Sequence, residues 1–296
     1  MKKQFIALAV TLAISSLAQA DTLAKVKASG SVTMGVRDSS GALSYTLGDG
    51  KYTGYHVEIC QAILADLEKA VGKKIEIKYQ SVTSQNRIPL VQNGTVDIEC
   101  GSTTNNATRQ KDVSFAHTTF VEEVRIAVKA NSGITSIAQL NGRNVATTTG
   151  TTSVQTLRKN ERATGVDFKE VFGKDHSESF LLLESGRADA FVMDGSILAG
   201  NIATAKNPAD FKIVGEVLSV EPIAIMMRKD DPAFKKLADE TIAGLAKSGA
   251  LAKLYDKWFM QPIPPKNTRV GLAASDGIKA AWATPNDKPM EDYAKK

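Results

Sequence analysis

The feature that most constrains the fold is an alternation of short apolar strands with helices, and it occurs twice along the chain. The first run predicts strands at 31–36, 75–82 and 96–100, with helices at 55–71 and 88–92. The second run predicts strands at 143–148, 167–172 and 188–193, with helices at 152–159 and 178–184. Strand–helix–strand alternation is typical of α/β folds with mainly parallel sheets.

Two such runs in a chain of 296 residues predict two lobes, because one core rarely organises a chain of this length. Further strands are predicted at 211–215 and 222–227, followed by two helices between Pro232 and Phe259. The extended segments 120–126 and 217–222 are predicted to cross between the lobes. We therefore expect lobe 1 from residues 21–122 and 221–265, lobe 2 from 123–220, a cleft between them, and a tail at 266–296 packed on the surface.

The first twenty residues have the pattern of a secretory signal peptide. Lys2 and Lys3 precede an apolar run over 5–14, and Ala18-Gln19-Ala20 is a small-x-small cleavage site. The apolar run is shorter than the roughly 20 residues that span a bilayer. We expect cleavage before Asp21 and a soluble protein exported to the periplasm.

Export leaves two alternatives for Cys60 and Cys100, which are 40 residues apart and are the only two cysteines of the chain. In an oxidising compartment they can form a disulfide, which would stabilise the fold by roughly 2–4 kcal/mol. They can equally be two small buried side chains, because sequence gives no separation in space.

Composition and motifs argue against several classes of function. The formal charge is +5, and its positive residues are scattered rather than gathered in a stripe, so we expect no nucleic-acid partner. The three histidines, His56, His117 and His176, lack metal-ligand spacing, and the chain has no phosphate-binding glycine loop and no nucleophile elbow. We therefore predict no metal, no cofactor and no catalytic residue.

Polar side chains follow the predicted strands at the points where the strands end. They are Arg37, Ser84, Arg87, Ser102, Thr104, Arg109, Thr152, His176 and Asp194. In open α/β sheets ligands bind at the carboxyl ends of strands, so these side chains are expected to converge on one place. Each alone has a simpler interpretation as a solvated arginine, a helix cap or a turn residue.

Several segments resemble the type 3 (cluster F) solute-binding proteins of ABC importers, in the branch for acidic amino acids. The resemblance is carried by residues 84–90, 99–106, 174–176, 183–187 and 256–259 and extends over nearly all of the chain after residue 20. It implies a two-lobed periplasmic-binding-protein fold (type II), with two hinge-crossing strands and a ligand held in the interlobe cleft.

The resemblance also implies residue roles toward a ligand, L-glutamate or L-aspartate. Arg109, Thr104 and Thr152 would hold its α-carboxylate, while Ser102 and Asp194 would hold its α-ammonium. The side-chain carboxylate would contact Arg37, Ser84, Arg87 and His176. The chain departs from the family's pattern at Gly195, where an acidic residue is expected.

These roles predict the binding component of an ABC transporter, a monomer that delivers its ligand to an inner-membrane permease complex. Two alternatives are a dehydratase-type enzyme for small acids on the same fold and a ligand-loaded partner of a membrane chemoreceptor. If His176 contacts the ligand as a cation, affinity should fall as pH rises above roughly 6.5–8.

Overall fold

The computed structural model describes residues 21–293. The predicted signal peptide lies outside these residues. Within them, none of the helices combines the length and the hydropathy needed to cross a membrane.

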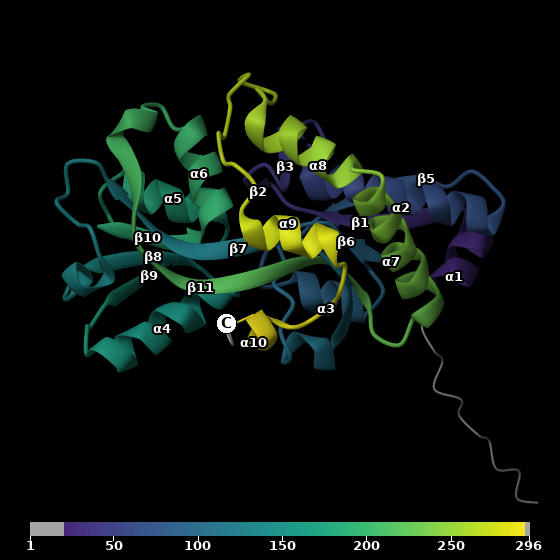
Figure 1. Ribbon diagram of the computed structural model, residues 1–296, viewed down its shortest axis with the longest axis horizontal. Helices are drawn as coiled ribbons and strands as arrows, with labels where there is room; N and C mark the ends of the chain where they lie inside the picture. The colour runs from purple at the N-terminus through teal and green to yellow at the C-terminus, as the bar shows by residue number, and fades with distance from the viewer. Residues whose placement is uncertain (1–20, 294–296) are drawn as a thin grey trace, which may run out of the picture.

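The two predicted lobes share a single sheet, rather than each lobe having its own (Figure 1). Its strand order within the described residues is β5-β1-β6-β11-β7-β10-β8-β9. The outer strands of each lobe are parallel, as predicted, and the two central strands run antiparallel to their neighbours. The bounds are β1 Ser31–Val36, β5 Glu76–Ser81, β6 Ile98–Glu99, β7 Val113–Lys129, β8 Asn144–Thr148, β9 Lys169–Gly173, β10 Ala190–Asp194 and β11 Phe211–Arg228.

The long strands β7 and β11 both run from one lobe into the other, and the two predicted crossing segments lie within them. The separate strands predicted at 211–215 and 222–227 are instead one strand, β11, with a register shift between Val214 and Ser219. Gly215 lies at this shift with a φ of +76°, a left-handed conformation that suits glycine. The glycine that ended the predicted strand therefore marks a bulge inside a longer one.

Helices cover both faces of the sheet in each lobe. In lobe 1, α2 (Tyr55–Val71), α7 (Pro232–Lys247), α8 (Ala250–Tyr255) and α9 (Asp276–Ala283) pack on one face and α3 (Arg87–Gln92) on the other. In lobe 2, α4 (Thr152–Thr164) covers one face, and α5 (His176–Glu184) and α6 (Gly195–Thr204) cover the other. The apolar clusters change from lobe 1 to lobe 2 between Val121 and Val124 on β7 and between Leu218 and Ile223 on β11.

Some elements differ from the sequence-based prediction. The helix predicted at 152–159 continues to Thr164, and the strand predicted at 96–100 is shortened to β6. Several elements of the described residues were not predicted. The polar segments contain α1 (Thr22–Ser29), β2 (Ser39–Ser40), β3 (Ser44–Gly48) and β4 (Lys51–Thr53), and helix α6 and the tail helices α9 and α10 (Met290–Tyr293) were also missed. Helix α1 carries a weak apolar stripe but begins at a capping aspartate, Asp21, whose Oδ1 accepts from the N–H of Ala24 at 2.8 Å.

The C-terminal segment lies against lobe 1 and the hinge. Ile278 and Ala281 of α9 join the lobe 1 apolar cluster, and Trp282 donates through Nε1 to the carbonyl of Thr119 on β7 at 3.0 Å. Before α10 (Met290–Tyr293), the Asn105 amide donates to the carbonyl of Asp287 at 2.9 Å. The tail therefore contacts the strand ends that lead into the cleft.

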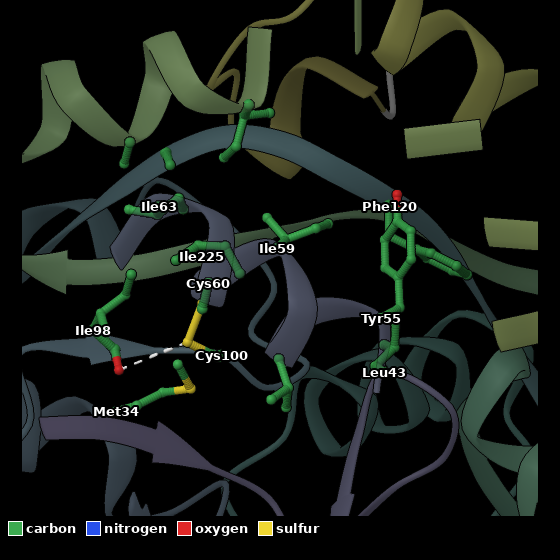
Figure 2. Packing of buried hydrophobic residues seen from close by; sticks show 14 of the residues in the cluster. Met34, Leu43, Tyr55, Ile59, Cys60, Ile63, Ile98, Cys100, Phe120 and Ile225 are labelled. Carbon is green, nitrogen blue, oxygen red and sulfur yellow. Dashed lines mark hydrogen bonds between the residues drawn. A yellow bond between two sulfur atoms is a disulfide. The ribbon is translucent and has the colours of Figure 1, made fainter. Parts of the chain in front are cut away.

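Cys60 and Cys100 form a disulfide, which resolves the alternative left open by the sequence. Figure 2 shows the bond inside the lobe 1 cluster, among Met34, Ile63 and Ile98. It ties α2 to the residue immediately after β6. The loop that follows, Gly101 to Thr104, is thereby anchored at the residue that precedes it.

Reduction of this disulfide should lower the free energy of unfolding by about 2–4 kcal/mol, because the unfolded chain regains the freedom of a 40-residue loop. Denaturant unfolding with and without a thiol reductant measures the difference. A Cys60→Ser, Cys100→Ser double variant should unfold at the reduced protein's midpoint whether reductant is present or not. An unchanged midpoint, with both thiols shown to be free, would contradict the prediction.

Candidate functional site

The structure brings the nine predicted site residues together at the carboxyl ends of the parallel strands. Arg37 follows β1, Ser84 and Arg87 follow β5, and Ser102 and Thr104 follow β6. From lobe 2, Thr152 begins α4, His176 begins α5 and Asp194 ends β10. All of these side chains are buried, and Arg109, in the short helix Arg109–Lys111, is half-buried.

Arg37 is the centre of a hydrogen-bond network that joins the two lobes. Its Nη2 donates to Ser84 Oγ at 2.9 Å and to His176 Nε2 at 3.2 Å, and its Nη1 lies 3.4 Å from Ser102 Oγ. Burial, followed by the nearby charge of Arg87, lowers the pKa of Arg37 to about 9. It remains a cation at neutral pH and offers a guanidinium to the cleft.

His176 is neutral in this arrangement. A guanidinium only donates, so His176 Nε2 accepts from Arg37, and its Nδ1, 3.0 Å from Thr148 Oγ1, carries the proton. Burial first, and then Arg37 and Arg87, lower the pKa of His176 well below its usual value. The condition behind the expected fall of affinity at high pH, a cationic His176, is therefore not met here.

Arg87 has no hydrogen-bond partner for its Nε and Nη1 atoms among residues 21–293, although it is only 2% exposed. Burial lowers its pKa, and the nearby carboxylates Glu99, Asp194 and Glu221 act in the opposite direction. Leaving a buried charged donor unpaired costs more than the about 1–3 kcal/mol of a neutral group. A bound ligand with a carboxylate between the lobes would supply the acceptors that the Arg87 guanidinium lacks.

Thr104 and Thr152 face each other across the cleft, and both donate to one carboxylate oxygen. The two hydroxyls lie 3.3 Å apart, and each lies 2.6 Å from Glu221 Oε2. Glu221 is fully buried on β11, and its Oε1 accepts from Ser219 Oγ at 2.8 Å. Each hydroxyl has one proton, so Glu221 fixes the direction of both.

Arg109 also bridges the lobes. Its Nη1 donates to the carbonyl of Thr104 at 2.8 Å, and its Nη2 lies 3.4 Å from the carbonyl of Gly150. The lobes also approach closely here. A Cβ added at Gly150 of lobe 2 would stand only 2.8 Å from the Cα of Gln85 of lobe 1. The structure therefore has the two lobes closed on each other.

Four buried carboxylates lie at or near the cleft, and of these only Asp194 was predicted from the sequence. Glu99, Asp194 and Glu221 are close enough to the arginines to act on their pKa values. Glu99 ends β6, Glu122 lies on β7 and Glu221 on β11, each at most 2% exposed. Glu122 accepts hydrogen bonds from the backbone N–H and the hydroxyl of Ser196. The available signal was the presence of charged residues in both crossing segments, Glu122, Glu123 and Arg125 in 120–126 and Glu221 in 217–222.

One cavity lies apart from these residues. A cavity of about 270 Å³ opens between β2, α6 and the segment 263–270, and no predicted site residue lines it. Within residues 21–293, no group of three or more His, Cys, Asp or Glu side chains is arranged to hold a metal ion.

Comparison with known proteins agrees with this architecture. Residues 32–261 match the family of bacterial extracellular solute-binding proteins, family 3. The chain is 44% identical over 291 residues to a glutamate/aspartate import solute-binding protein of Escherichia coli, covering 95% of this chain and 96% of that one. It is also 44% identical to an L-glutamate/L-aspartate-binding protein of Pseudomonas aeruginosa, covering 91% and 90%.

A crystal structure of a mutant arginine-binding protein from T. maritima is similar, with a TM-score of 0.72 and 27% identity over 81% of this chain and 99% of that one. Sequence and fold thus lead to the same assignment: the chain belongs to family 3 of the bacterial extracellular solute-binding proteins.

Proposed function

We propose that this protein is the periplasmic solute-binding component of an ABC importer and that it captures L-glutamate or L-aspartate in the interlobe cleft. The observation that carries the proposal is Arg87, a buried guanidinium whose Nε and Nη1 lack acceptors among the described residues. Together with Arg37, it provides two buried cations at one end of the cleft. A ligand carboxylate satisfies such a pair with bidentate hydrogen bonds.

The cleft is polarised along the sheet, which fits an acidic amino acid. The arginines Arg37 and Arg87 come from the β1 and β5 side, with one carboxylate, Glu99 of β6, near them. The other three carboxylates, Asp194, Glu122 and Glu221, come from β10 and the hinge strands. A ligand with its ammonium toward the hinge and its side-chain carboxylate toward lobe 1 matches both ends. Ser102 and Asp194 would then receive the ammonium and Arg109 the α-carboxylate. Thr104 and Thr152 would line the same part of the cleft, with their hydroxyl protons directed to Glu221.

The relatives support the same class of ligand. The two relatives described above are named for glutamate and aspartate and cover nine-tenths or more of this chain. Those proteins are named as binding proteins, and the Escherichia coli relative as an import protein, which favours transport over an enzyme. A monomer that docks on an inner-membrane permease complex is consistent with the family.

Titration calorimetry with Glu, Asp, Gln and Asn tests the proposal. Glu and Asp should bind, and the amides should bind about a hundredfold more weakly, because a neutral side chain leaves two buried arginines uncompensated. NMR of the same mixtures should detect no product. Tight binding of the amides would overturn the acidic specificity, and conversion of any ligand would indicate an enzyme.

Arg87→Met should weaken the binding of Glu and Asp at least about tenfold. Methionine nearly keeps the side-chain volume and removes a buried, unpaired cation, so the ligand-free protein should be at least as stable as the wild type. The matched control is Arg187→Met, at an exposed loop position, which should leave affinity unchanged. Unchanged affinity of Arg87→Met would remove this residue from the site.

His176 should carry one ring proton, on Nδ1, throughout the pH range near neutrality, because Arg37 donates to Nε2. Ring ¹⁵N NMR of the ligand-free protein identifies this tautomer and should show no titration of His176 near pH 6.5, where an ordinary histidine titrates. A ring protonated on both nitrogens at pH 7 would contradict the assignment.

A further inference from the structure

Three buried carboxylates from three adjacent strands lie at the hinge side of the cleft. Glu122 on β7 is directly opposite Glu221 on β11, and Asp194 on β10 is opposite Val124, two residues from Glu122. Directly opposed residues point to the same face of an antiparallel pair, so the three side chains share one face of the sheet. Their exposures are 2% for Glu122, 0% for Glu221 and 4% for Asp194.

No lysine, arginine or histidine of the described residues forms an ion pair with any of the three. Glu122 and Glu221 receive hydrogen bonds from neutral donors, Ser196 for the first and Thr104, Thr152 and Ser219 for the second. Asp194 receives no side-chain capping hydrogen bond at the start of α6. Buried like charges without a paired cation do not all ionise.

We propose that capture of the ligand is coupled to release of a proton that Glu122 and Asp194 hold in this cluster, next to Glu221. The inference rests on the proposed function, since the cation that replaces the proton is the ligand's α-ammonium. Charge and protons balance in this step. The zwitterion enters with its ammonium intact, and the protonated carboxyl loses H⁺ to solvent. The charge of the cluster therefore becomes more negative by one. The incoming positive charge offsets that change.

Burial and the neighbouring carboxylates raise the pKa values of Glu122 and Asp194, as proton release requires. Burial raises the pKa of Glu122 to about 7, with Glu221 and Glu123 acting in the same direction and the Ser196 hydrogen bonds opposing it. Burial, Glu122 and Glu221 raise the pKa of Asp194 far more than Arg87 and Arg109 lower it. The cluster also acts on two other titratable groups. Burial lowers the pKa of Arg37 and Asp194 acts against this, while burial and then Glu122 raise the pKa of Tyr255.

The direction in which affinity changes with pH distinguishes proton release by these carboxyls from proton uptake by His176. A carboxyl whose raised pKa falls when the ammonium arrives releases a proton, so affinity should rise with pH until the ligand-free cluster is ionised. A histidine that becomes charged beside a ligand carboxylate takes up a proton, so affinity should fall with rising pH. We expect Kd for L-glutamate to decrease about tenfold between pH 5.5 and pH 7.

Titration calorimetry of the ligand-free protein with L-glutamate near pH 6.5, in buffers of different ionisation enthalpy, counts the protons released. We expect between about one half and one proton per ligand. Binding without proton release, or with uptake, would overturn this inference and leave the proposed function standing. Absence of any binding would overturn both.

Two conservative variants locate the proton. Glu122→Gln removes a carboxyl with a raised pKa, and Glu221→Gln removes a neighbouring charge that raises the pKa of Glu122 and Asp194. Both keep an amide oxygen for the neighbouring donors, and proton release should fall at least about twofold in each. The matched control is Glu216→Gln, an exposed carboxylate on the same strand as Glu221, which should release as many protons as the wild type. Release unchanged in both cluster variants would place the proton elsewhere, for example on the ligand's own amine, and would overturn the proposal.

Discussion

The antiparallel pairing of β7 with β11 is the interaction on which the rest of the structure depends. Both strands run through lobe 1 and lobe 2, and their ladder continues from Phe211 opposite Lys129 to Arg228 opposite Val113. Because the pairing passes between the lobes, the hinge is a piece of sheet rather than two separate linkers. Side chains on it, such as Glu122 and Glu221, therefore lie at the junction between the strand ends of the two lobes.

This hinge makes the charge pattern of the cleft a property of the strand order. The parallel strands of lobe 1 end in Arg37 and, a few residues after β5, Arg87, while the strands that carry carboxylates occupy the middle of the sheet. The disulfide and Gly101 fix the loop between these two ends. A Cβ at Gly101 would stand 2.2 Å from Glu99 Oε1 and 2.7 Å from Arg37 Cγ, so only glycine lets the loop pass between a buried acid and a buried base.

Much of this was predictable from the sequence, and the remainder was not for definite physical reasons. Strand ends are marked locally by a change from apolar to polar residues, and so Arg37, Ser84 and Asp194 could be identified. Which strands pair is a long-range property, so the sharing of one sheet and the opposition of Glu122 and Glu221 were not predictable. The disulfide depended on a distance that spacing along the chain does not contain.

Closure and ligand capture are linked through the groups that closure buries. With the lobes closed, Arg87 and a cluster of carboxylates are enclosed, and each unpaired polar group costs about 1–3 kcal/mol or more. A ligand can shift the balance between open and closed forms only by interacting differently with the two. An acidic amino acid does so at both ends of the cleft, because its carboxylates pair the arginines and its ammonium faces the acids only when the lobes enclose it. The cost of enclosing unpaired arginines and carboxylates disfavours closure without ligand. Because only an acidic amino acid pairs both groups, the same cost makes ligand binding specific.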